Sequence, residues 1–99
     1  MGASDELIHQ SLRLRIMAAL HAAEKDPEPL DFTRLKRLVE ATDGNLGSHL
    51  ATLEKAGYVA VEKDFIGRKP RTRVSMTAAG RAAFRAHVAF LRDVIDSAG

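Results

Sequence analysis

The sequence predicts a mainly α-helical domain that carries one small β-hairpin. Three observations lead to this fold class. Apolar residues recur at helical spacing in four segments, their period changes to strict alternation in two short runs within residues 58–76, and glycine and proline punctuate the boundaries. A chain of 99 residues is most simply one domain, so we take residues 1–99 as a single unit.

The composition excludes several classes of protein. The chain is 45% hydrophobic and 28% charged, as is ordinary for a globular protein. No apolar run approaches the roughly 20 residues of a membrane-spanning helix, and the N-terminus lacks a secretory pattern. Cysteine is absent, which excludes disulfides and thiolate metal sites. We expect a cytoplasmic protein that has no membrane segment and needs no cofactor.

A short helix is predicted to begin near Phe32. Asp31 is a suitable N-cap, and the apolar residues Phe32, Leu35, Leu38 and Val39 repeat at helical spacing. Residues 30–32 have two interpretations, a very short strand or simply the entry to this helix. The helix ends near Glu40, so only a tight turn precedes the next helix, and this predicts a helix-turn-helix over residues 32–57.

The second helix of this pair, residues 43–56, has a defined start and stop. Thr42 or Asp43 can cap its N-terminus, and Gly57 can end it in a left-handed conformation. One face is apolar and is predicted to point inward: Leu46, Leu50 and Leu53.

Another face of the same helix carries hydrogen-bonding side chains: Asn45, Ser48, His49 and Thr52. Such groups can read the edges of bases in a major groove. The alternative is an amphipathic helix whose polar face is simply solvated. The tight turn before the helix and the basic hairpin after it favour the DNA-reading interpretation.

The hairpin over residues 58–76 is predicted to be a wing. Val59 and Val61 alternate with polar residues in one run, and Val74 and Met76 do so in the other. Between them we expect a loop over residues 66–72. The loop together with the residue after it carries four basic residues and no acid: Arg68, Lys69, Arg71 and Arg73.

Positive charge is concentrated around these elements. The segment from Arg34 to Arg73 holds nine basic and five acidic residues, whereas the rest of the chain holds six basic and eight acidic ones. This distribution favours a surface that faces phosphates.

The first and last helices, predicted over residues 5–25 and 78–97, carry more apolar rows than a small domain can cover. Ser4 and Thr77 are their predicted caps. Apolar rows of this size at a surface usually mark an interface.

These motifs resemble the winged helix-turn-helix domain of MarR/ArsR-type transcriptional regulators, particularly the short stand-alone members. The matching pieces, in order, are Phe32-x-x-Leu35, residues 42–46, Ser48-His49-Leu50, Leu53-Glu54-x-x-Gly57-Tyr58-Val59, residues 67–70 and Met76-Thr77-x-x-Gly80-Arg81. They extend over more than half of the chain. Additional helices that form a ligand pocket in larger MarR-type proteins have little room here, so an effector is not assigned.

The resemblance implies a homodimer that places residues 43–56 in the major groove of a pseudo-palindromic operator and the wing on phosphates or the minor groove. The predicted DNA contacts are Arg34, Asn45, Ser48, His49, Thr52, Lys55, Arg68, Lys69, Arg71 and Arg73. The predicted dimer interface consists of Leu7, Leu14, Met17, Phe84, Val88, Leu91 and Ile95.

Other functions are less well supported by the sequence. Catalytic motifs such as G-x-S-x-G or a phosphate-binding glycine loop are missing, and the four histidines lack the spacing of metal ligands. The main alternative is a winged-helix module that binds another protein, because a fold does not fix its use.

Overall fold

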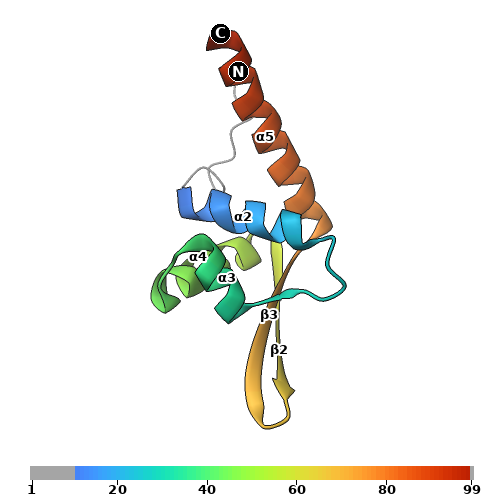
Figure 1. The fold of residues 1–99 in the computed structure, drawn as a ribbon. Coiled ribbons are helices and arrows are strands. Elements are labelled where there is room, and N and C mark those ends of the chain that lie inside the picture. The colour runs from blue at the N-terminus through green and yellow to red at the C-terminus, as the bar shows by residue number, and fades with distance from the viewer. Residues whose placement is uncertain (1–10, 99) are drawn as a thin grey trace.

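The computed structural model describes residues 11–98, which form four helices and three strands (Figure 1). The predicted mainly α-helical fold with a small β-hairpin is confirmed. The proposed cap at Ser4 lies outside the described residues. The elements are α2 (Ser11–Ala23), β1 (Leu30–Asp31), α3 (Phe32–Val39), α4 (Asp43–Lys55), β2 (Val59–Ile66), β3 (Lys69–Met76) and α5 (Ala78–Ala98).

A small antiparallel sheet supports the hairpin, with β3 in the centre of the order β1-β3-β2. β1 pairs Leu30 with Val74, so the segment before α3 is a short strand rather than only a helix entry. β2 and β3 stay paired from the domain core out to Ile66 and Lys69. The hairpin therefore projects well beyond the helices, as Figure 1 shows.

The wing is more regular than predicted. The prediction of a loop over residues 66–72 is wrong, because β3 begins at Lys69 and only Gly67 and Arg68 connect the strands. Gly67 has a φ of 62°, which suits the two-residue turns that join twisted strands. The outer half of the hairpin buries neither face, so it lacks the apolar alternation that identifies a strand from sequence.

α4 begins and ends at backbone signals that fix its position. The hydroxyl of Thr42, rather than the carboxylate of Asp43, caps it by accepting a backbone N–H at 3.1 Å. At the other end Gly57 has a φ of 83°, and the N–H of Tyr58 donates to the carbonyl of Leu53 at 2.9 Å. This glycine-based stop motif turns the chain directly into β2.

The core lies where α2, α3, α4 and the inner half of the hairpin meet the start of α5. Met17 and Phe84, which we predicted at a dimer interface, are 0% and 8% exposed and belong to this core instead. Helical spacing identifies an apolar row but does not show what covers it, and Leu38, in the predicted row of α3, is 56% exposed. The apolar core consists of Ile16, Met17, Leu20, Leu30, Leu35, Val39, Leu46, Leu50, Leu53, Val59, Val74, Met76 and Phe84.

The start of α5 packs tightly against Gly57 and Tyr58, in the turn that follows α4. The Thr77 hydroxyl donates to the carbonyl of Gly57 at 2.6 Å and accepts the N–H of Gly80 at 3.0 Å. Gly80 is buried against the backbone of Tyr58, where a Cβ atom would overlap the carbonyl oxygen. From this anchor α5 extends away from the body of the molecule (Figure 1).

Candidate nucleic-acid interface

α4 presents one polar face to solvent because its opposite face is held in the core. Leu46 and Leu53 are 0% exposed, and a helix places residues half a turn away on the outer side. Asn45 and Ser48 are exposed there, and Thr52 is half-buried. The Thr52 hydroxyl donates to the carbonyl of Ser48 at 3.2 Å, so its oxygen remains available as an acceptor.

His49 lies at the edge of this face rather than at its centre. Its Nδ1 accepts a hydrogen bond from Nε of Arg13 on α2 at 3.0 Å. The ring is half-buried, and Nε2 is the nitrogen left for any contact outside the protein. Of the four predicted groove residues, three share the exposed face and His49 also joins α4 to α2.

Two small residues on the exposed face were missed by the sequence analysis. Gly44 and Ala51 are both exposed on α4, and at Gly44 an added Cβ would meet no atom within 4 Å. Small side chains let a helix backbone approach a groove closely. They lie seven positions, or about two turns, apart along the helix. This spacing was the available signal, but neither residue carries a polar group.

The turn between α3 and α4 is fixed by its own interactions. Lys36 on α3 forms an ion pair of 2.8 Å with Asp43 at the start of α4. Glu40 has a φ of 54°, a left-handed conformation that is costly for a residue with a Cβ atom. Arg34 is exposed on α3, and Lys55 is exposed at the end of α4.

The basic residues of the wing fall into two groups. Arg71 binds Asp64 through two hydrogen bonds, Nε–Oδ1 at 2.9 Å and Nη2–Oδ2 at 2.8 Å. Arg73 lies 3.2 Å from Asp64 and 3.7 Å from Glu62. The hydrogen bonds from Arg71 hold the pKa of the Asp64 carboxyl below its usual range. These two arginines are thus neutralised by acids on β2.

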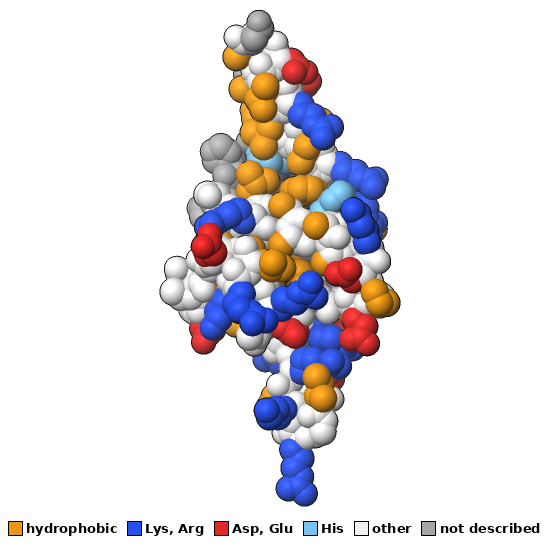
Figure 2. All heavy atoms as spheres, viewed as in Figure 1, with side chains coloured by type: hydrophobic (Ala, Val, Ile, Leu, Met, Phe, Trp, Pro, Cys, Tyr) orange, Lys and Arg blue, Asp and Glu red, His pale blue; other side chains and the backbone are white. Residues whose placement is uncertain are grey.

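Arg68 and Lys69 form the second group. Both are exposed at the end of the hairpin, where Figure 2 shows basic side chains at the extreme tip of the molecule. Within residues 11–98 neither forms an ion pair with an acid. The structure therefore brings the predicted wing residues together but leaves only this pair with uncompensated charge.

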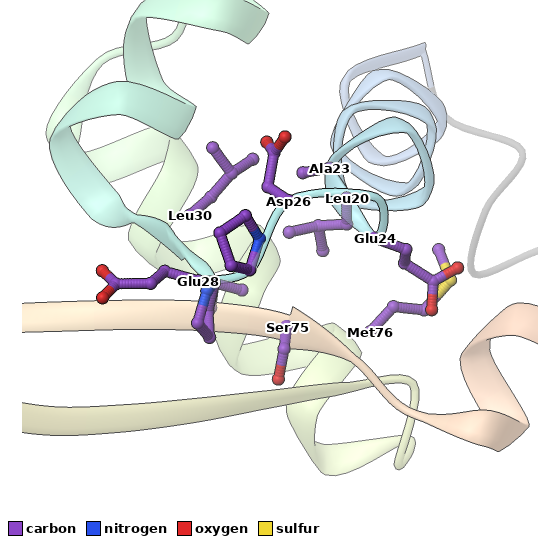
Figure 3. A pocket seen from close by; sticks show the side chains of 11 residues that line it. Leu20, Ala23, Glu24, Asp26, Glu28, Leu30, Ser75 and Met76 are labelled. Carbon is purple, nitrogen blue, oxygen red and sulfur yellow. The ribbon is translucent and has the colours of Figure 1, made fainter.

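A small cavity lies on a different side, between the end of α2 and β3 (Figure 3). Its volume is about 180 Å³, and Glu24, Asp26 and Glu28 are among the residues that line it. Glu24 binds Arg81 at 2.9 Å, and this hydrogen bond lowers the pKa of the Glu24 carboxyl. The acidic character of this rim makes it unsuitable for phosphates.

The described part of the chain contains no cluster of three metal-ligating side chains. Among its helices, none is both long enough and apolar enough to cross a bilayer.

Comparison with known proteins identifies similar chains. Residues 12–95 match a family described as a winged helix DNA-binding domain. An uncharacterised protein of Methanocaldococcus jannaschii is 32% identical over 83 residues, which cover 84% of this chain and 86% of that protein. The solved transcriptional regulator homologue of Pyrococcus horikoshii has a TM-score of 0.82 at 30% identity, and the match covers 94% of this chain and 88% of the homologue.

The fold also matches a longer regulator that was solved with DNA. The Mycobacterium tuberculosis regulator MosR, in complex with DNA, has a TM-score of 0.72 at 20% identity. The match covers 93% of this chain but only 62% of MosR.

Proposed function

Because this chain belongs to the winged-helix DNA-binding family of transcriptional regulators, we propose that it binds a pseudo-palindromic operator as a homodimer. α4 would enter the major groove and the wing would contact phosphates or the minor groove. This matches the MarR/ArsR-type resemblance on which the prediction rested. The family description names DNA binding rather than catalysis, and we assign the protein no enzymatic role.

The observation that carries this proposal is the opposite character of the two faces of α4. Its leucines are buried, whereas Asn45 and Ser48 are exposed and make no side-chain hydrogen bond within residues 11–98. Amide and hydroxyl groups that are left unpaired on a rigid helix can discriminate base edges. The similar fold of MosR, a regulator solved with DNA, supports the same assignment.

The remaining predicted contacts take different roles in this proposal. Arg68 and Lys69 neutralise phosphates, since no acid compensates them, and Arg34 and Lys55 can add backbone contacts. Arg71 and Arg73 are instead assigned to bracing the hairpin through Asp64 and Glu62. This changes the prediction for those two arginines from direct DNA contact to support of the wing.

The outer part of α5 is the proposed dimer interface. Ile95 is 69% exposed and Val94 is 51% exposed, and Val88 and Leu91 are half-buried on the same helix. Figure 2 shows apolar side chains along this end of the molecule. Leu14 of α2 is half-buried and stays in the proposal. Leu7 lies outside the described residues.

The proposal is tested by selecting bound fragments from a pool of random duplexes with purified protein. We expect enrichment of a two-fold symmetric motif whose half-sites lie about 34 Å, or one helical turn, apart. Sedimentation at micromolar concentration should show a dimer. If no sequence is enriched, the protein-binding alternative is favoured. If the protein sediments as a monomer, the outer part of α5 is not a dimer interface.

A further inference from the structure

The end of the wing exposes two large apolar side chains beside its cations. Phe65 is 69% exposed and Ile66 is 59% exposed. They are the last two residues of β2, and Phe65 lies opposite Pro70 in the register of the hairpin. Large apolar groups at a protruding tip contribute nothing to the core, so they are better explained by a partner.

Three cations surround this apolar tip. Lys63 lies on β2, Arg68 in the turn and Lys69 on β3, and all three are exposed. Lys63 pairs in register with Thr72, on the same face as Phe65, while Lys69 pairs with Ile66. Cations therefore lie on both strands of the hairpin.

The nearby acid does not cancel this charge. The Asp64 carboxylate is held by Arg71 and Arg73 at 2.8 Å and 3.2 Å. Phe65 and Ile66 are consecutive in β2 and so lie on opposite faces of the hairpin, and each face of the tip carries one large apolar side chain beside a cation. A partner of matching chemistry has an apolar interior between two rows of negative charge.

The minor groove of DNA has that chemistry, since sugars and base edges lie between two phosphate backbones. It is about 6 Å wide, so the end of a two-stranded hairpin can enter it only with its terminal side chains. We propose that Phe65 and Ile66 form an apolar wedge that enters the minor groove and partly unstacks a base step, while Lys63, Arg68 and Lys69 hold the flanking phosphates.

This inference rests on the proposed DNA binding but assigns a separate source of specificity. Wedges of this kind favour steps that unstack easily, such as TA and CA/TG. The wing would therefore select operators by their deformability at positions where α4 makes no contact.

Phe65→Ala and Ile66→Ala test the wedge, and Leu38→Ala serves as the control because Leu38, on α3, is 56% exposed and belongs to no proposed contact. Duplexes carry 2-aminopurine, whose fluorescence rises when it unstacks, at each step of the site. We expect Phe65→Ala to lose about tenfold in affinity, as aromatic truncation at a stacking contact does. It should also lose the fluorescence rise, while keeping the salt dependence of the wild type.

Arg68→Ala should show the opposite pattern. The slope of log K against log salt should fall by about 0.9 per phosphate contact, and the fluorescence rise should be retained. Phe65→Trp, which keeps a large aromatic side chain, should bind the duplex as tightly as wild type and should keep the fluorescence rise. These outcomes together would support the wedge, provided that Leu38→Ala leaves the fluorescence rise intact.

Three results would overturn it. If wild type binds the duplex and Phe65→Ala binds equally well with unchanged fluorescence, the wedge is wrong although DNA binding stands. If wild type binds no duplex, the proposed function itself fails. If Phe65→Ala loses binding to phosphatidylglycerol vesicles but not to DNA, the tip serves an anionic membrane surface instead.

Discussion

Arg13 on α2 donates a hydrogen bond from Nε to Nδ1 of His49 on α4 at 3.0 Å. This contact joins two helices across 36 positions of sequence. It also fixes the ring at the edge of the face that we propose to enter the major groove. The orientation of α4 is therefore set by side-chain hydrogen bonding as well as by its buried leucines.

The contact should be measurable as a coupling free energy. A double-mutant cycle with Arg13→Ala, His49→Ala and the double variant should give a coupling of about 0.5–1.5 kcal/mol, the usual net value of a hydrogen bond. Urea unfolding of wild type and the three variants is the measurement. Strictly additive single effects would show that the two side chains do not interact in solution.

Two glycines should respond to alanine in opposite directions. Gly80→Ala should destabilise the protein by about 1–3 kcal/mol or more, because its Cβ would overlap the Tyr58 carbonyl. Gly47→Ala, within α4, should stabilise it by about 0.5–1 kcal/mol, since nothing lies within 4 Å of its Cβ. Thermal unfolding of both variants measures this contrast. Equal changes in stability would mean that Gly80 on α5 does not approach the Tyr58 backbone this closely.

The pairing of Glu24 with Arg81 predicts a pH dependence of stability. Since the pairing lowers the folded-state pKa of Glu24, it stabilises the fold above the unfolded pKa, and this contribution is lost as the pH falls through the folded pKa. Glu24→Gln should therefore be less stable than wild type at pH 7. The gap should narrow below about pH 4, near the ordinary pKa of a carboxyl. A gap that is constant from pH 7 to pH 3 would contradict the pairing.

The two groups of wing cations should differ in their effect on DNA binding. Arg68→Gln should lower the slope of log K against log salt by about 0.9 per contact without affecting stability. Arg71→Gln should instead weaken the hairpin, because it leaves Asp64 without its bidentate partner. Affinity titrations at several salt concentrations, together with melting curves, separate the two. If both variants lower the slope of log K against log salt equally, Arg71 contacts a phosphate directly, as the sequence predicted.

The outer end of α5 should control association. Ile95→Asp should convert the proposed dimer into a monomer at micromolar concentration without lowering the melting temperature of the protomer, because Ile95 is 69% exposed. Sedimentation velocity measures the first effect and calorimetry the second. An Ile95→Asp protein that remains dimeric would move the interface elsewhere.

The local signals of the sequence predicted the helix-turn-helix well. The leucine spacing of α4, a cap at Thr42 or Asp43 and the stop at Gly57 are each decided by neighbours within a few residues. The structure shows the leucines buried, Thr42 as the cap and Gly57 at the stop. Contacts that depend on tertiary structure were not predictable in the same way. The acids that neutralise Arg71 and Arg73 are on the facing strand, so their pairing requires the register of the hairpin.

The terminal helices show the same limit. Met17 and Ile95 both belong to apolar rows with helical spacing, yet one is 0% exposed and the other 69% exposed. Whether a row packs inside the protomer depends on how far its helix extends beyond the body, and periodicity does not contain that information. The Arg13–His49 contact likewise required the packing of α2 against α4.

The most direct test of the central claim compares wild type with an Asn45→Ala/Ser48→Ala variant on two duplexes, the selected operator and its scrambled sequence. If α4 reads bases, wild type should prefer the operator, and the variant should lose about 1–3 kcal/mol of that preference for each true base contact. Its affinity for the scrambled duplex should stay unchanged. An equal loss on both duplexes would contradict base reading by α4.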